Sequence, residues 1–195
     1  MNLPNKLTVL RIILVPFMVA AMLLDFQYNY LVAGLIFGAA SITDYFDGSI
    51  ARKRNLITDF GKFADPIADK ILVISALVCF LAKGLCDPII LIIVLFREFV
   101  VTSIRLSAAS SGKVVAANMW GKVKTVTQMI AIICIFVLQT SLQIFGQYIL
   151  SNFDYHEIAY IFFIIGEVLL WISVVFTVIS GVKYVIDNKD AISDM

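Results

Sequence analysis

DYFDGSIAR at residues 44–52 and GKFADPIAD at residues 61–69 hold four carboxylates within twenty-six residues of a chain that is 61% hydrophobic. Carboxylates in such surroundings are costly unless they are paired with cations or bound to metal. Steps of three, four and seven residues put four positions of the first segment on one stripe of a helix: Asp44, Asp47, Gly48 and Ala51. In the second segment, Asp65 and Asp69 are four residues apart and can face the same way.

Two helices that each offer a pair of carboxylates can build an all-oxygen site for hard divalent cations, with water and phosphate completing the shell. The alternative is that these aspartates cap helices or carry charge at the membrane surface. A cap uses one carboxylate, not four on two facing stripes. The spacing therefore predicts a metal site formed by Asp44, Asp47, Asp65 and Asp69.

Composition places the chain among polytopic membrane proteins. Its 195 residues have a mean hydropathy of +0.97, well above that of a soluble domain. The formal net charge is +1, so bulk charge predicts no nucleic-acid partner. The first residues do not look like a signal peptide. The three cysteines have no paired spacing and are expected to be small, reduced, buried hydrophobes: Cys79, Cys86 and Cys134.

Six apolar ranges are long enough to cross a bilayer, which takes about 20 residues each. They are 7–25, 30–50, 64–83, 88–108, 121–142 and 156–184. Because the connections are short, we expect one domain over residues 1–195, with an all-α, six-helix transmembrane fold. Pro4 indicates a short interfacial turn before the first span, and Pro88 suits the first turn of the fourth helix.

Basic residues set the expected orientation. If six spans are threaded, twelve of them fall on one side: Lys6, Arg11, Arg52, Lys53, Arg54, Lys62, Arg105, Lys113, Lys122, Lys124, Lys183 and Lys189. Near the other side, Lys83 is opposed by four acids: Asp25, Asp87, Asp154 and Glu157. The positive-inside rule then predicts that both termini and the aspartates lie at the cytoplasmic face.

A second polar group follows the aspartates. Arg97 and Glu98 interrupt an apolar run, Arg105 comes eight residues later, and Lys122 and Lys124 begin the fifth span. One interpretation is ion pairing of Arg97 with Glu98 or an aspartate, with the other cations extending toward the surface. The other is a basic pocket for a phosphate of an acceptor substrate, since Arg and Lys both recognise phosphate.

The pattern formed by the aspartates resembles the signature of the CDP-alcohol phosphotransferase family, with every fixed position present. The similarity extends over most of the chain: LPNKLTVLR at 3–11, ITDYFDG at 42–48, FGKFADPIADK at 60–70, Arg97-Glu98, WGKVKT at 120–125 and Gln128-Met129. Within the family, these segments are similar to those of bacterial members that use glycerol 3-phosphate.

The resemblance implies transfer of a phosphatidyl group from CDP-diacylglycerol to sn-glycerol 3-phosphate, releasing CMP, in phospholipid biosynthesis. It implies two divalent cations, Mg²⁺ or Mn²⁺, on the four aspartates, with Asp69 also as the candidate general base. The expected CDP-diacylglycerol contacts are Asn5, Thr8, Gly48, Ala51, Arg52 and Gly61, and the expected glycerol 3-phosphate contacts are Arg97, Arg105, Lys122 and Lys124. It also favours a homodimer whose lipid substrate stays in the bilayer.

Two other functions fit part of the pattern. A related enzyme with a different acceptor, such as phosphatidylglycerol, inositol phosphate or serine, would carry the same aspartates. A cation-coupled transporter would also bury carboxylates, but it needs polar positions that reach both faces. Glu167 lies among apolar residues of the last range, and an internal pair with a basic residue is one interpretation of it.

Overall fold

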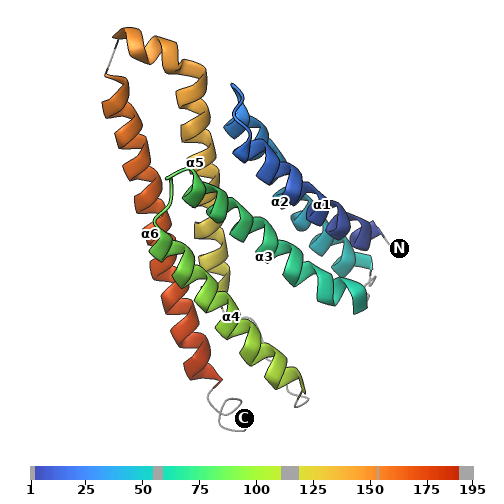
Figure 1. The fold of residues 1–195 in the computed structure, drawn as a ribbon. Helices are drawn as coiled ribbons and strands as arrows, with labels where there is room; N and C mark the ends of the chain where they lie inside the picture. Colours follow the sequence, from blue (N-terminus) through green and yellow to red (C-terminus); the bar gives the residue numbers. More distant parts are fainter. Residues whose placement is uncertain (1–2, 55–58, 111–118, 153, 189–195) are drawn as a thin grey trace.

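In the part of the chain that it describes, the computed structural model is a bundle of six helices (Figure 1). It describes the backbone of residues 3–54, 59–110, 119–152 and 154–188, and the side chains of 5–43, 67–106, 108, 119–146 and 154–188. The helices are α1 (Leu3–Leu23), α2 (Asn29–Arg54), α3 (Asp59–Ala82), α4 (Pro88–Ser110), α5 (Met119–Asn152) and α6 (Tyr155–Asp187). No strand occurs in these residues, so the predicted all-α fold is confirmed.

The helices are those of a polytopic membrane protein. Parts of α1, α5 and α6 are long and apolar enough to cross a bilayer: Asn5–Leu23, Met119–Gly146 and Tyr155–Asp187. In α2, α3 and α4 the apolar sequence is interrupted by the charged residues singled out above. Large apolar side chains face outward, with Phe96 71% exposed, as expected where lipid replaces water around the bundle.

Three helix ends can be compared with the expected ones, and two of them differ. Helix α1 already begins at Leu3, so Pro4 lies in its first turn and not in a separate turn before it. Pro88 is the first residue of α4, as expected. Helix α5 continues ten residues past the expected end at 142, to Asn152, because the polar residues there do not break a helix.

The bundle has two halves, with α1, α2 and α3 on one side and α4, α5 and α6 on the other (Figure 1). An aromatic group joins them: the Phe136 ring of α5 lies 5.7 Å from that of Phe37 in α2 and 5.0 Å from that of Phe80 in α3. A Cβ atom on Gly34 would lie 3.1 Å from the Phe136 Cβ, which shows how closely α2 and α5 approach. This contact fixes the height of α5 against α2 and α3.

Successive helices alternate in direction, so the start of α1, the end of α2 and the start of α3 lie together at one end of the bundle (Figure 1). At the opposite end, Lys83 Nζ donates to Asp25 Oδ1 over 2.9 Å. This ion pair connects the α1–α2 connection to the end of α3 and partly neutralises the charge of Lys83 at that end of the bundle. The aspartates of α2 and α3 therefore lie toward the other end of the bundle, where α1 begins.

Candidate active site

Asp69 is placed by α3 and held by α1. Its side chain is 52% exposed and makes an ion pair with Arg11, whose side chain is completely buried. The two residues are 58 positions apart in the chain. From the sequence, Arg11 was expected only as a basic residue of the cytoplasmic side. Its position within an otherwise apolar first span is the signal that could have identified it as a residue of the site. The carboxylate is thus fixed by a buried cation while one side stays open to a ligand.

Asn5 and Thr8 lie on the same face of α1 as Arg11. The three residues are spaced three apart and all are buried, so they form one polar stripe on a helix that packs against α2 and α3. The structure therefore brings Asn5 and Thr8 to the side of α1 that faces the aspartate helices. Their contact with a nucleotide remains a prediction.

The other signature residues lie within helices but outside the described side chains. Asp44, Asp47, Gly48, Ala51 and Arg52 belong to α2, and Gly61 and Asp65 belong to α3. At about 1.5 Å per residue, Asp44 lies about 15 Å before the end of α2, and Asp69 lies about 15 Å after the start of α3. Asp47 lies about 10 Å before the end of α2, and Asp65 lies about 10 Å after the start of α3. The helix bounds place the two pairs at matching heights.

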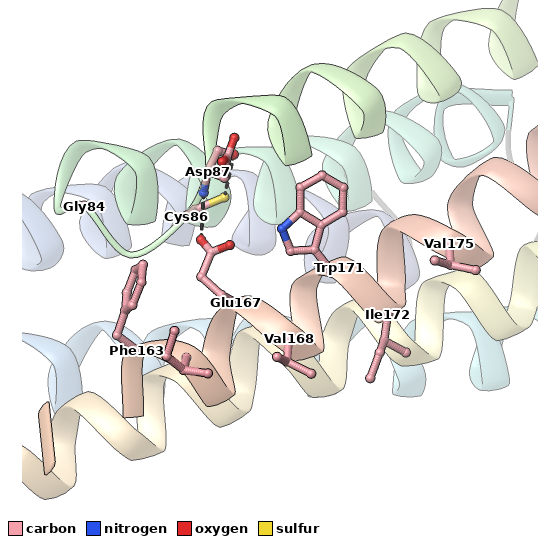
Figure 2. Close-up of a pocket in the computed structure, with 10 residues that line it drawn as sticks. Gly84, Cys86, Asp87, Phe163, Glu167, Val168, Trp171, Ile172 and Val175 are labelled. Atoms are coloured by element: carbon pink, nitrogen blue, oxygen red, sulfur yellow. Dashed lines mark hydrogen bonds between the residues drawn. The ribbon is translucent and has the colours of Figure 1, made fainter. Parts of the chain in front are cut away.

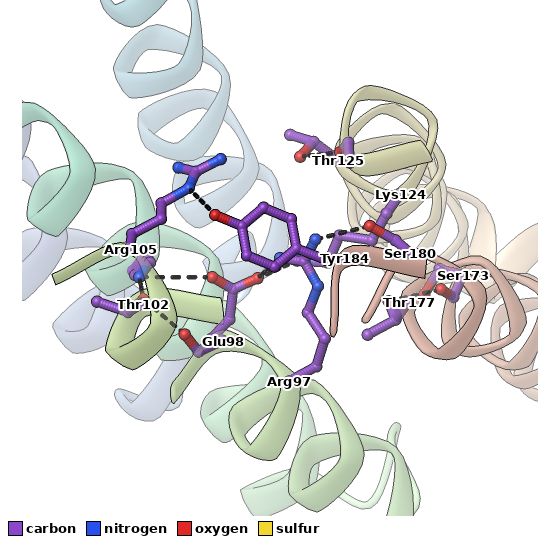
Figure 3. Close-up of polar contacts among 12 residues, drawn as sticks. Arg97, Glu98, Thr102, Arg105, Lys124, Thr125, Ser173, Thr177, Ser180 and Tyr184 are labelled. Atoms are coloured by element: carbon purple, nitrogen blue, oxygen red, sulfur yellow. Dashed lines mark hydrogen bonds and ion pairs between the residues drawn. The ribbon is translucent and has the colours of Figure 1, made fainter. Parts of the chain in front are cut away.

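Glu98 of α4 is the centre of a second polar group, shown in Figure 3. Its Oε1 accepts hydrogen bonds from Lys124 Nζ of α5 at 2.6 Å and from Arg97 Nη1 at 3.0 Å. Lys70 Nζ of α3 lies 3.7 Å from Oε2. Lys70 also donates to Thr102 Oγ1. Three cations from three helices therefore meet one carboxylate, which leaves an excess of two positive charges.

This Glu98 group is well shielded from solvent. The side chain of Glu98 is 13% exposed and that of Lys124 is 7% exposed. Lys70 is more accessible and directly follows Asp69 in α3. The pairing of Arg97 with Glu98 confirms the ion pair of the first interpretation. The expectation that Lys124 extends toward the surface is wrong, because Lys124 is buried against the same carboxylate. It does not exclude the other, because three cations meet a single carboxylate.

The remaining two basic candidates are exposed. Arg105 Nε donates to Tyr184 Oη of α6 at 3.3 Å, and its guanidinium carbon lies 5.6 Å from the centre of that ring. Lys122 is exposed at the start of α5. The structure therefore brings Arg97 and Lys124 together at Glu98, sets Arg105 against Tyr184, and leaves Lys122 at the surface of the bundle.

Comparison with known proteins shows to which family this chain is similar. The family model described as CDP-alcohol phosphatidyltransferase matches residues 1–179. The chain belongs to the CDP-alcohol phosphatidyltransferase family.

Several curated members of the CDP-alcohol phosphatidyltransferase family are similar over nearly their whole length. A protein of Bacillus subtilis (strain 168) is 39% identical over 98% of this chain and 97% of its own length. One of Rickettsia felis is 39% identical, covering 94% and 93%. One of Haemophilus influenzae is 34% identical, covering 99% and 96%. All three are named CDP-diacylglycerol–glycerol-3-phosphate 3-phosphatidyltransferase.

The donor set predicted for this member of the CDP-alcohol phosphatidyltransferase family fits a hard divalent cation. All four candidate ligands are carboxylates, which suit Mg²⁺ and Mn²⁺ better than softer metals. Asp69, the one whose side chain is described, is half exposed with a buried arginine beside it. No cluster of three ligands exists among the described side chains, which include only this one of the four. The metal site therefore remains a prediction supported by helix register.

A separate hollow of about 560 Å³ lies on the far side of this family member, between the α3–α4 connection and α6 (Figure 2). Glu167 Oε1 accepts the backbone N–H of Asp87 at 2.8 Å. The interpretation that Glu167 pairs with a basic residue is therefore wrong for the described residues, because a backbone donor takes that place. Burial raises the pKa of the Cys86 thiol in this connection to about 12, so the thiol is inert at neutral pH.

Proposed function

We propose that this protein transfers the phosphatidyl group of CDP-diacylglycerol to sn-glycerol 3-phosphate, forming phosphatidylglycerophosphate and CMP in phospholipid biosynthesis. The observation that carries the proposal is the excess of positive charge around Glu98, which begins at Lys70, the residue next to Asp69. A small dianionic acceptor needs a cationic pocket close to the group that activates its hydroxyl. The names of the curated relatives support the same reaction.

In the proposed reaction, a hydroxyl oxygen of glycerol 3-phosphate attacks the phosphorus of the phosphatidyl group. The bond from that phosphorus to the oxygen shared with CMP breaks, and CMP leaves with the bonding electrons. Asp69 receives the hydroxyl proton or orients that hydroxyl for attack. Arg11 holds the Asp69 carboxylate in place during this step. Phosphoryl transfer of this kind depends mainly on positioning and on neutralising charge.

Two divalent cations, Mg²⁺ or Mn²⁺, would be held by Asp44, Asp47, Asp65 and Asp69, and when bound they neutralise the pyrophosphate charge. Gly48, Ala51 and Gly61 would leave room for the cytidine end, and Arg52 would contact its phosphate. Asn5 and Thr8 would line the same end from α1, where both are buried. The acyl chains would stay in the bilayer beside the apolar outer surface.

Arg97, Arg105, Lys122 and Lys124 form the proposed acceptor pocket, together with Lys70. Arg97 and Lys124 already share Glu98, so the carboxylate orders them before a substrate arrives. Arg105 lies two turns further along α4 and is exposed, where it can meet the acceptor as it enters. Recognition of a phosphate distinguishes this acceptor from serine, which carries none.

We infer a cytoplasmic position for the active face and for both termini, in a single domain over residues 1–195. The pairing of Lys83 with Asp25 supports this orientation, because it offsets a cation of the other face. We also propose a homodimer. Gly34 and Ala40 are used inside the bundle, whereas Ala39 is exposed and a Cβ on Gly38 would meet no described atom within 4 Å, which leaves a small-residue surface for a second copy.

Purified protein incubated with CDP-diacylglycerol and labelled glycerol 3-phosphate tests the reaction. We expect labelled phosphatidylglycerophosphate, no product with EDTA, and recovery on adding Mg²⁺ or Mn²⁺. Phosphatidylglycerol, inositol phosphate and serine serve as competing acceptors in parallel. Faster product formation with one of these acceptors would refute the assignment of glycerol 3-phosphate.

A further inference from the structure

We infer that Ser180 and Tyr184 of α6 are positioning residues that set the two acceptor arginines of α4, an inference that rests on the proposed function. Arg97 Nη2 donates to Ser180 Oγ at 2.7 Å, and Arg105 Nε donates to Tyr184 Oη at 3.3 Å. Both α6 residues are buried. Both lie beyond residue 179, where the match to the family model ends.

Ser180 differs from its neighbours on the same face of α6. Ser173, Thr177, Ser180 and Tyr184 follow at steps of four, three and four residues, and all are buried. The first two bond within their own helix: Ser173 Oγ donates to Leu170 O, and Thr177 Oγ1 donates to Ser173 O, each at 2.7 Å. Ser180 instead accepts from Arg97 of α4 (Figure 3). Its hydroxyl is thus directed at the arginine of another helix.

Glycines of α5 and α6 lie on either side of Arg97, and the one in α6 makes room for the arginine. A Cβ on Gly181 would lie 3.1 Å from Arg97 Cγ, tighter than nine in ten real Cβ contacts. A Cβ on Gly121 of α5 would lie 3.7 Å from Arg97 Nη2 and 3.8 Å from Ser180 Oγ. The side chain therefore lies in a slot with glycine on both flanking helices. With Glu98 on Nη1 and Ser180 on Nη2, the plane of the guanidinium is fixed.

This arrangement exceeds what packing of three membrane helices requires. An apolar side chain would fill the same space without the cost of burying a charge. Arg97 Nε is buried and has no hydrogen-bond partner among the described residues, so the guanidinium is held through its two Nη atoms alone. A guanidinium that is already held in one plane can bind an anion with little further loss of conformational entropy.

Tyr184 holds Arg105 in a different way. Its hydroxyl accepts from Nε, and its ring lies under the guanidinium at 5.6 Å from carbon to centroid. The ring and the hydroxyl together limit the rotation of an otherwise exposed side chain. Because Ser180 and Tyr184 are one turn apart, a single segment of α6 sets the geometry of both arginines.

The test compares single substitutions in the full-length enzyme, using KM for each substrate. Ser180→Ala is expected to raise KM for glycerol 3-phosphate about fivefold, the equivalent of one lost hydrogen bond of about 1 kcal/mol. KM for CDP-diacylglycerol is expected to stay within about twofold. Ser180→Thr keeps the hydroxyl and should restore most of the loss. Ser173→Ala, on the same face but bonded only within α6, is the matched control and should change neither KM.

Two further variants keep the inference testable if Ser180→Ala folds poorly. Tyr184→Phe removes only the hydroxyl and should raise KM for glycerol 3-phosphate about threefold, less than the loss of a full hydrogen bond because the ring contact remains. Ser180→Ala combined with Arg97→Gln should show no more than the KM of Arg97→Gln alone, since the serine acts through that arginine.

The outcomes separate this inference from the proposed function. If Arg97→Gln and Lys124→Gln leave KM for glycerol 3-phosphate unchanged, the acceptor pocket itself is misplaced. If these two variants raise that KM while Ser180→Ala and Tyr184→Phe do not, the pocket stands and the role of α6 is refuted. Equal changes in both KM values for Ser180→Ala, or an effect as large in Ser173→Ala, would mean that α6 only contributes to folding.

Discussion

Replacing Glu98 by Gln should destabilise the protein strongly, and most of the loss should come from the cations it leaves behind. The carboxylate is 13% exposed, and it meets Lys124 at 2.6 Å, Arg97 at 3.0 Å and Lys70 at 3.7 Å. Glutamine has nearly the same shape but no charge, so three cations remain close together with nothing to balance them. Breaking a buried ion pair from one side costs about 3–5 kcal/mol.

Thermal unfolding in detergent measures this effect. For a chain of this size, 1 kcal/mol corresponds to about 2–4 °C in Tm, so we expect Glu98→Gln to lower Tm by about 10 °C. The decisive sample is the double variant Glu98→Gln with Lys124→Met. Removing the lysine, whose side chain is 7% exposed, also removes an uncompensated buried charge. The double variant should therefore unfold at a higher temperature than Glu98→Gln alone.

Suppose that Lys124→Met lowers the stability of the Glu98→Gln protein by as much as it lowers the stability of the unsubstituted protein. That result would refute this account. Additivity of that kind would mean that the two side chains do not interact across the bundle. The matched control is Glu157→Gln in the first turn of α6, an exposed carboxylate far from the Glu98 group. Its Tm should change by about 2 °C or less, as for most surface substitutions.

Three other predictions follow from the structure. Asp69→Asn should remove most phosphatidyltransferase activity while the protein still enters the membrane, and near-normal turnover in that variant would exclude Asp69 as the base. A single cysteine at position 2, in a background without the native cysteines, should react with an impermeant maleimide only after cells are broken; labelling of intact cells would reverse the orientation. In a variant that retains only Cys86, alkylation at pH 8 should be slow until the protein is denatured, because burial raises the pKa of that thiol to about 12; rapid reaction of the folded protein would show the thiol to be accessible and ionised.

The helices could be predicted from the sequence because apolar length alone specifies a membrane span. The same is true of the spacing of the aspartates: the positions of Asp44 and Asp69, each ten residues from its helix end, follow once α2 and α3 are helical. The pairing of Arg97 with Glu98 is likewise local, since the residues are adjacent in the chain. These features depend on short-range spacing, which a single sequence contains.

The contacts between distant helices could not be predicted in this way. Arg11 with Asp69, and Arg97 with Ser180, join residues 58 and 83 positions apart. Which face of α1 or α6 turns inward depends on how six helices pack together, and α6 is apolar on nearly every side. The partner of Glu167 was missed because it is the backbone N–H of Asp87. Almost every residue has a backbone N–H, so the pattern of side chains does not indicate which one will donate.

The unequal lengths of the helices have a consequence for the surrounding lipid. At about 1.5 Å per residue, α5 with 34 residues and α6 with 33 are each about 50 Å long, whereas α1 with 21 is about 32 Å. A hydrocarbon layer of about 30 Å cannot cover the two long helices upright, so they extend beyond it, tilt, bend or thicken the bilayer locally. Figure 1 shows α5 turning near its far end. Any change in the tilt of α6 moves Ser180 and Tyr184 relative to α4. We therefore expect the thickness of the surrounding membrane to influence how α6 sets the arginines of α4.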